Sequence, residues 1–149
     1  KRVFSDEING GPGVMITDLI NDGIAVLTID AFLIGEHHSP FEPSTRLRIG
    51  GFMDTFQPTD TGNRIQDVLT SIAYLRSRRD MTGNIRLISQ DAGSVWVRFA
   101  AAVDPSVSVT ADNDDGFNHD DVWWTTDFYI PSIRTIGGLR LADALSGRK

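Results

Sequence analysis

The chain has 149 residues, no cysteine, and a formal net charge of −6 from 20 acidic and 14 basic side chains. Its length predicts a single domain over residues 1–149, and the lack of cysteine excludes disulfides, thiolate nucleophiles and cysteine zinc sites while leaving the compartment open. The negative charge argues against nucleic acid as a partner. No apolar run is long enough to span a bilayer, and no signal-peptide core is visible, so neither a membrane partner nor a leader is expected.

The first part of the chain predicts a loop, a helix and a strand. Glycines and a proline at 9–13 indicate a loop. Apolar residues then follow at helical spacing from Val14 to Ile20, and Asn21-Asp22-Gly23 ends the pattern. The run from Gly23 to Asp30 is nearly all apolar, which is typical of a strand buried on both faces of a parallel sheet.

A long excursion from Ala31 to Asp60 contains His37 and His38 and has no clear periodicity. The next segment has the strongest helical pattern in the sequence, with Asp60 or Thr61 as the expected cap. Its apolar positions are Ile65, Val68, Leu69, Ile72 and Leu75. The arginines in its last turn, Arg76, Arg78 and Arg79, are expected to be solvated at the carbonyl end of the helix.

Residues 83–103 read as a short strand, a turn of small residues from Ser89 to Gly93, and an alanine-rich helix. Asp104-Pro105 ends this helix, and Val107 to Ala111 supplies another short strand. Helices and strands therefore alternate along the chain. Such alternation predicts right-handed crossovers and a parallel sheet between helices, that is, a three-layer α/β architecture.

The C-terminal part is acidic and aromatic. Five aspartates surround Gly116 and His119 (Asp112, Asp114, Asp115, Asp120 and Asp121), and they indicate a hydrated loop with calcium as the alternative. The aromatic residues that follow are expected to pack in the core (Trp123, Trp124, Phe128 and Tyr129). A weaker helical pattern follows Pro131. The N-terminal glycine loop lacks the features of a dinucleotide site or a P-loop, so no cofactor and no metal are predicted.

These residues resemble α/β-hydrolases over about Gly10 to Ala111. The run Gly23–Asp30 resembles the fourth strand of that fold, and the helix Asp67–Arg78, the following strand and the 89–93 turn resemble its next units. The helix is most similar to that of the acetyl-xylan-esterase and dienelactone-hydrolase-like branch. The resemblance implies a mostly parallel sheet with helices on both faces, of which this chain contains an incomplete strand set. It further implies that another chain, or the remainder of the same polypeptide, completes the sheet.

In this family the turn is a nucleophile elbow, and Asp91 stands at the nucleophile position. Three interpretations follow. Asp91 is a carboxylate nucleophile, as in the dehalogenase and epoxide-hydrolase branches; or the elbow has lost its nucleophile and the domain is a silent module used for packing or assembly; or Ser89 or Ser94 has replaced it. If the site is active, the implied substrate is a small-molecule ester or an acylated carbohydrate.

The remaining site residues also follow from the resemblance. Amides of Ala92 and Gly11 would form the oxyanion hole, since one follows the nucleophile position and the other lies in the glycine loop. His119 is the sole histidine after Asp91 and the candidate base, although a histidine in an acidic loop is more often only solvated. The acid and histidine of a complete triad are not visible in this chain.

Overall fold

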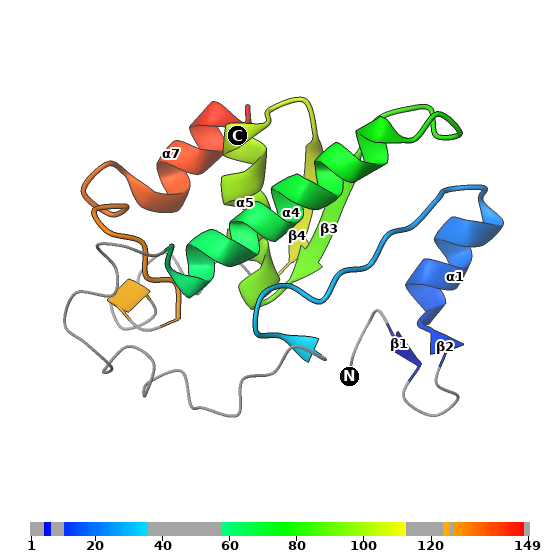
Figure 1. Cartoon of the computed structure of the whole chain (residues 1–149), viewed down its shortest axis with the longest axis horizontal. Helices are drawn as coiled ribbons and strands as arrows, with labels where there is room; N and C mark the ends of the chain where they lie inside the picture. Colours follow the sequence, from blue (N-terminus) through cyan, green and yellow to red (C-terminus); the bar gives the residue numbers. More distant parts are fainter. Residues whose placement is uncertain (1–4, 7–10, 36–57, 113–123, 126, 148–149) are drawn as a thin grey trace.

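The computed structural model describes residues 5–6, 11–35, 58–112, 124–125 and 127–147 (Figure 1). In chain order these residues form β1 (Ser5–Asp6), β2 (Gly11–Pro12), α1 (Val14–Asn21), α4 (Asp60–Ser77), β3 (Arg86–Gln90), α5 (Ala92–Val103), β4 (Ser108–Asp112) and α7 (Gly138–Leu145). No helix in the described part of the chain has the length and apolar character needed to cross a bilayer.

The sheet at the centre of the fold is a parallel pair. β3 and β4 run side by side in the register Leu87↔Val109. One face is apolar and packs against α4 and α5, because Leu87 and Val109 contact the core cluster formed by those helices. The described residues therefore belong to the α/β class, and the predicted parallel arrangement of these two strands is confirmed.

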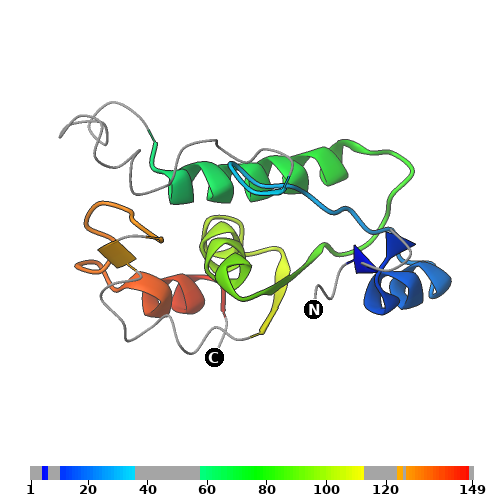
Figure 2. The same cartoon turned by 90° about the horizontal axis from the view of Figure 1, so that it is seen from below.

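The opposite face of the sheet is partly exposed among the described residues, with Ile88 half-buried. Arg86, Ser108 and Thr110 are all exposed there. α1 lies on this side of the sheet, away from α5 (Figures 1 and 2), but it leaves large apolar side chains such as Val14 exposed. Helices thus cover one face of the described strands.

The predicted buried strand at Gly23–Asp30 is wrong for the described structure. The helix before it ends as expected, with Gly23 at a positive φ of 76°. The run then has no strand pairing, and every residue from Asn21 to Asp30 is exposed. A continuous apolar run predicts burial, but burial on both faces needs neighbours on both sides, and the described residues supply none to this run.

α4 begins one residue earlier than expected. Its cap is Thr59, whose hydroxyl oxygen accepts a hydrogen bond from the Gly62 amide at 3.1 Å, and not Asp60 or Thr61. Thr61 is instead buried, and its hydroxyl donates to the carbonyl of Asp127 at 3.2 Å. This bond ties the start of α4 to the C-terminal part of the chain. The predicted apolar face is confirmed, since Val68 and Ile72 are buried.

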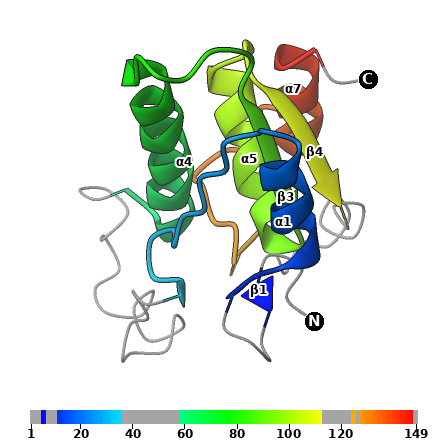
Figure 3. The same ribbon diagram turned by 90° about the vertical axis from the view of Figure 1, so that its right-hand side faces the viewer.

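α5 is the most enclosed element of the fold. Figures 2 and 3 show it between α4 on one side and α7 on the other, and it also packs against both strands. Its alanines Ala100 and Ala101 are fully buried in the cluster with α4, while Val95 and Phe99 are buried in a second cluster with the C-terminal segment. Small residues on one side therefore let α4 and the sheet approach closely.

The C-terminal segment packs on the outer side of α5. Trp124 and Phe128 are buried, as expected for core aromatics, while Trp123 lies outside the described residues. α7 starts at Gly138, later than the apolar pattern after Pro131 indicated, because Ser132 and Gly137 both adopt positive φ in the preceding turns. Leu139 and Ala142 bury the inner face of α7 against this cluster.

A buried ion pair joins α7 to α5. Arg98 is 4 % exposed, and its Nε donates to Asp143 Oδ1 at 2.8 Å while Nη2 bonds the other carboxylate oxygen. This bidentate geometry is the strong form of an arginine–carboxylate pair. Arg98 was not among the predicted buried residues, and it occupies a position on α5 that would otherwise be apolar.

Candidate functional site

Asp91 forms the sharp turn between β3 and α5. Its backbone has φ 49° and ψ −130°, and it is the residue that immediately precedes the helix. This combination lies outside the left-handed well that non-glycine residues tolerate, so the turn is strained. The side chain is exposed to solvent. A strained strand-to-helix turn that presents one side chain is the backbone arrangement of an elbow.

Small residues on each side of Asp91 make this turn sterically feasible. Ser89 is 8 % exposed, and a Cβ placed on Gly93 would lie 3.4 Å from the Cβ of Ser89. A Cβ at Gly93 would therefore lie in van der Waals contact with the end of β3. The Ser89 hydroxyl is buried, and none of the described residues hydrogen bonds to it. Ser89 is therefore explained by its small size in a packed position, and not by a reaction of its hydroxyl.

The two serines near Asp91 are placed differently from it. Ser94 is fully buried, and Ser89 is nearly so, whereas Asp91 faces solvent. The Ser94 amide donates to the Asp91 carbonyl at 3.0 Å, which closes the first turn of α5. A hydroxyl that replaced the nucleophile would have to reach substrate from a buried position, so the geometry favours Asp91 over either serine.

Ala92, the predicted oxyanion donor, directly follows Asp91. It is the first residue of α5, so its amide is among the four that have no acceptor within the helix. Amides at this end of a helix also carry the positive end of the helix dipole. The Ala92 amide therefore lies beside Asp91 in a position suited to an anionic oxygen.

The other predicted site residues are not brought to Asp91. Gly11 belongs to β2, which pairs antiparallel with β1, and Figures 1 and 2 show this hairpin at the foot of α1, apart from the start of α5. His119, like His37 and His38, lies outside the described residues. The same is true of all the acidic cluster except Asp112. The described site thus consists of Asp91, Ala92 and the small residues around them.

A tight turn from Asp30 to Gly35 docks on α4 and was not predicted. Its Phe32 amide donates to Asp67 Oδ2 at 2.8 Å, and Arg64 Nε donates to the Phe32 carbonyl at 3.0 Å. Gly35 has a positive φ of 62°, which favours glycine, and a Cβ there would lie 2.2 Å from the Asp30 carboxyl carbon unless that side chain shifted. Arg64 also lies 5.0 Å from the ring centre of Trp96 in α5. Arg64 therefore links the turn to both helices.

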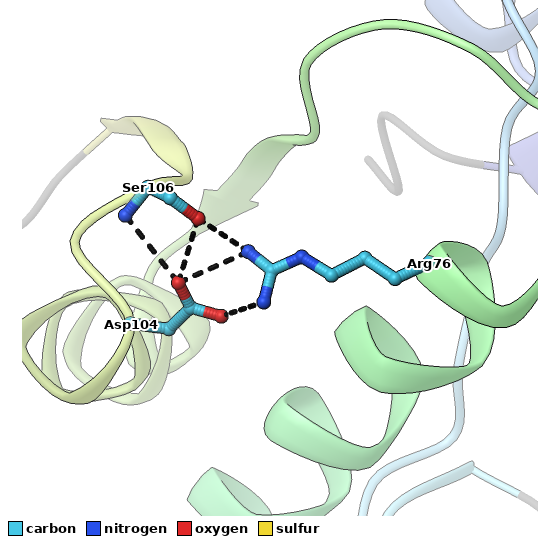
Figure 4. A network of polar contacts seen from close by, with 3 residues as sticks. All are labelled: Arg76, Asp104 and Ser106. Atoms are coloured by element: carbon cyan, nitrogen blue, oxygen red, sulfur yellow. Dashed lines mark hydrogen bonds and ion pairs between the residues drawn. The ribbon is translucent and has the colours of Figure 1, made fainter.

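A polar network lies at the other end of α4 (Figure 4). Arg76 forms an ion pair with Asp104, and both bond the hydroxyl of Ser106. The hydrogen bond from Arg76, followed by that from Ser106, lowers the pKa of Asp104 from 3.8 to about 2. The same bond with Asp104 raises the pKa of Arg76. Because the network joins the last turn of α4 to the turn between α5 and β4, 28 to 30 positions along the chain, it is structural.

We expect Asp104→Asn to reduce the sensitivity of the fold to acid. The folded pKa of Asp104 lies below its unfolded value, so the ionised carboxyl stabilises the fold above about pH 4, and this contribution is lost as pH falls from 3.8 to about 2. Urea unfolding across this window should therefore show a shallower loss of stability in the variant. Ser106→Ala removes only the hydroxyl bond, which lowers the pKa of Asp104 less than Arg76 does, and it should give a smaller change. Equal slopes for Asp104→Asn and the parent chain would contradict the assignment.

Asp91→Gly should be more stable than Asp91→Ala by about 1 kcal/mol. Both variants remove the carboxylate, but only glycine adopts a φ of 49° with ψ −130° without strain. For other residues this backbone conformation costs about 1–3 kcal/mol. The greater freedom of glycine in the unfolded chain offsets part of this gain. Chemical denaturation of the two variants measures the difference. Equal stability, or a more stable alanine variant, would show that the turn stores no strain.

Asp91 is exposed to solvent and is followed directly by Ala92, the first residue of α5. Among the described residues, no three histidine, aspartate or glutamate side chains gather as a metal site. No protein-family model, curated protein or solved structure matches the chain.

Proposed function

We propose that the chain is part of an α/β-hydrolase-type carboxylic-ester hydrolase of the acetyl-xylan-esterase-like kind, with Asp91 at the nucleophile position. The observation that carries the proposal is the strained, exposed conformation of Asp91 at the β3–α5 turn. Strain at one exposed polar residue is typical of functional sites. The complete domain would have three layers, with the sheet extended by another chain or by further polypeptide.

The chemistry follows from the placement of Asp91 and Ala92. A carboxylate oxygen of Asp91 would attack the acyl carbon of an ester, and the carbonyl oxygen would become an oxyanion near the Ala92 amide. Collapse of this intermediate breaks the ester C–O bond, forms a mixed anhydride on Asp91 and releases an alkoxide, which takes a proton from water to become the alcohol. Water then hydrolyses the anhydride to release the acid and restore the carboxylate. The substrate class is a small ester or an acylated carbohydrate.

A catalytically silent module is the second candidate. His119 is the sole histidine after Asp91 in the sequence, and it stands in an acidic loop. A carboxylate nucleophile still needs a base to activate the water that completes turnover. In a silent module the elbow would serve only to place α5 against the sheet, and the domain would act through assembly with a partner chain.

Hydrolysis of 4-nitrophenyl acetate by the full chain separates the two candidates. If Asp91 is the nucleophile, Asp91→Asn should lower the rate at least about 100-fold, because the amide cannot attack the ester. Asp80→Asn, which changes an exposed carboxylate after the end of α4, is the matched control and should retain the rate of the parent chain. A rate for the parent chain equal to that of buffer alone would support the silent module.

A further inference from the structure

The turn at residues 31–35 is a second strained segment of the fold, besides the turn at Asp91. Its Leu33 has a φ of 58°, and among the described residues only Asp91 and Ser132 are other non-glycine residues with a positive φ. A bulky side chain rarely adopts this region, so surrounding contacts must hold the 31–35 turn in place. Figures 1 and 3 show this turn at the end of the sheet where β3 and β4 finish, which is also the end that carries Asp91.

α4 holds the 31–35 turn through both backbone polar groups of Phe32. The Phe32 amide donates to Asp67 Oδ2 at 2.8 Å, and the Phe32 carbonyl accepts from Arg64 Nε at 3.0 Å. Arg64 and Asp67 are three residues apart, so they project from the same side of α4. Hydrogen bonds to charged groups are stronger than those between neutral groups. These two side chains therefore set the position of the turn.

Arg64 also reaches α5. Its guanidinium carbon lies 5.0 Å from the centre of the Trp96 ring, which is within the range of a cation–π interaction. Both residues are half-buried, so water screens this attraction less than it would screen a fully exposed pair. Arg64 thus contacts two elements at once, the 31–35 turn and α5.

Trp96 connects this contact to the candidate site. It stands four residues after Ala92, so the two residues lie on the same face of α5, and both pack against the same core cluster. The indole N–H of Trp96 is buried, and no acceptor among the described residues bonds it. Within this part of the chain, packing and the Arg64 guanidinium orient the ring. Loss of Arg64 should therefore free the ring and, with it, the first turn of α5.

We propose that Arg64 is a positioning residue for the proposed esterase site, and the inference rests on that proposed function. By holding the Trp96 ring and the 31–35 turn together, Arg64 restrains the first turn of α5 and so fixes the direction of the Ala92 amide. This amide would bind an oxyanion that is absent from the bound substrate, so the restraint should act on kcat and not on KM. The role of Arg64 is orientation, with no proton or bond transferred.

Steady-state kinetics of the full chain with 4-nitrophenyl acetate test this role. Arg64→Met keeps the length of the side chain but removes its charge and its hydrogen bond to Phe32. It should lower kcat about tenfold and keep KM within about twofold of the parent value, because a misplaced donor loses transition-state binding. Arg64→Lys keeps a cation beside Trp96 and should restore kcat to within about threefold of the parent value.

Arg76→Met is the matched control. It removes an arginine of the same helix, together with an ion pair and a bond to Ser106, but this network lies at the other end of α4 (Figure 4). The variant should leave both kcat and KM unchanged. Equal falls in kcat for the two methionine variants would show that Arg64 acts only through general stability, and a raised KM with an unchanged kcat in Arg64→Met would place it in substrate binding. Either result overturns the proposal.

Hydrogen exchange at the Ser94 amide is a readout that needs no activity. This amide donates to the Asp91 carbonyl at 3.0 Å, so its exchange reports on the first turn of α5. It should accelerate about tenfold in Arg64→Met, and by more than exchange at the fully buried Ala101 later in the helix. Arg76→Met should leave the ratio of the two rates unchanged. An unchanged rate at Ser94 in Arg64→Met overturns the proposal.

The two readouts separate this inference from the proposed function. If the parent chain does not hydrolyse the ester, the proposed function fails, and exchange at Ser94 decides alone whether Arg64 restrains the start of α5. If the parent chain hydrolyses the ester and Asp91→Asn does not, while Arg64→Met matches the parent in kcat and in exchange, the proposed function stands and this inference fails.

Discussion

Asp143→Ala is expected to lower the free energy of unfolding by about 3 kcal/mol, because it leaves the Arg98 guanidinium in the interior without its bidentate carboxylate. The Arg98 side chain is 5 % exposed, and that of Asp143 is 24 % exposed. The partial exposure of Asp143 puts the expected cost at the lower end of the range for buried pairs. Urea denaturation followed by circular dichroism measures the change.

Two further variants separate the charge effect from the packing effect. The double substitution Arg98→Met with Asp143→Leu replaces the pair with apolar side chains of similar length, and it should be much closer to the parent chain than Asp143→Ala is. Asp104→Ala removes one partner of the Arg76 pair, in which the Arg76 side chain is 46 % exposed, and it should cost far less. Similar losses for Asp143→Ala and Asp104→Ala would show that burial of Arg98 does not determine the effect.

Local patterns in the sequence predicted the elements whose stability depends on nearby residues. The spacing of Val68 and Ile72 identified the buried face of α4, and the small residues from Ser89 to Gly93 identified the turn between β3 and α5. These signals act within a few residues of one another. Periodicity and turn chemistry therefore carry them directly.

Features that depend on distant partners were not predictable in the same way. The Arg98–Asp143 pair joins residues 45 positions apart, and Arg98 has no local neighbour that marks it as buried. The apolar run Gly23–Asp30 indicates burial, but the neighbours that would bury it are not among the described residues. For the candidate site, the resemblance named Asp91 and Ala92 as candidates, while the strained φ of Asp91 was visible only in the structure.

Phe128→Ala is expected to destabilise the chain by about 3–4 kcal/mol, which makes the C-terminal segment an integral part of the core. Phe128 is 1 % exposed, its ring centre lies 5.9 Å from that of Trp124, and both rings belong to the cluster that covers the outer side of α5. Truncation removes a large apolar surface. It leaves a cavity next to α5 and α7 that these packed helices cannot fill. Ile136→Ala, at a position 59 % exposed, is the matched control and should change stability by less than about 1 kcal/mol.

The same pair of variants tests whether the elbow depends on this packing. α5 carries the candidate site at its first residue and the Phe128 cluster along its outer side, so loosening of that side should free the start of the helix as well. Hydrogen exchange at the Ser94 amide, which donates to the Asp91 carbonyl at 3.0 Å, should therefore accelerate in Phe128→Ala and not in Ile136→Ala. Unchanged exchange at Ser94 in a destabilised Phe128→Ala chain would show that β3 and α4 alone hold the turn.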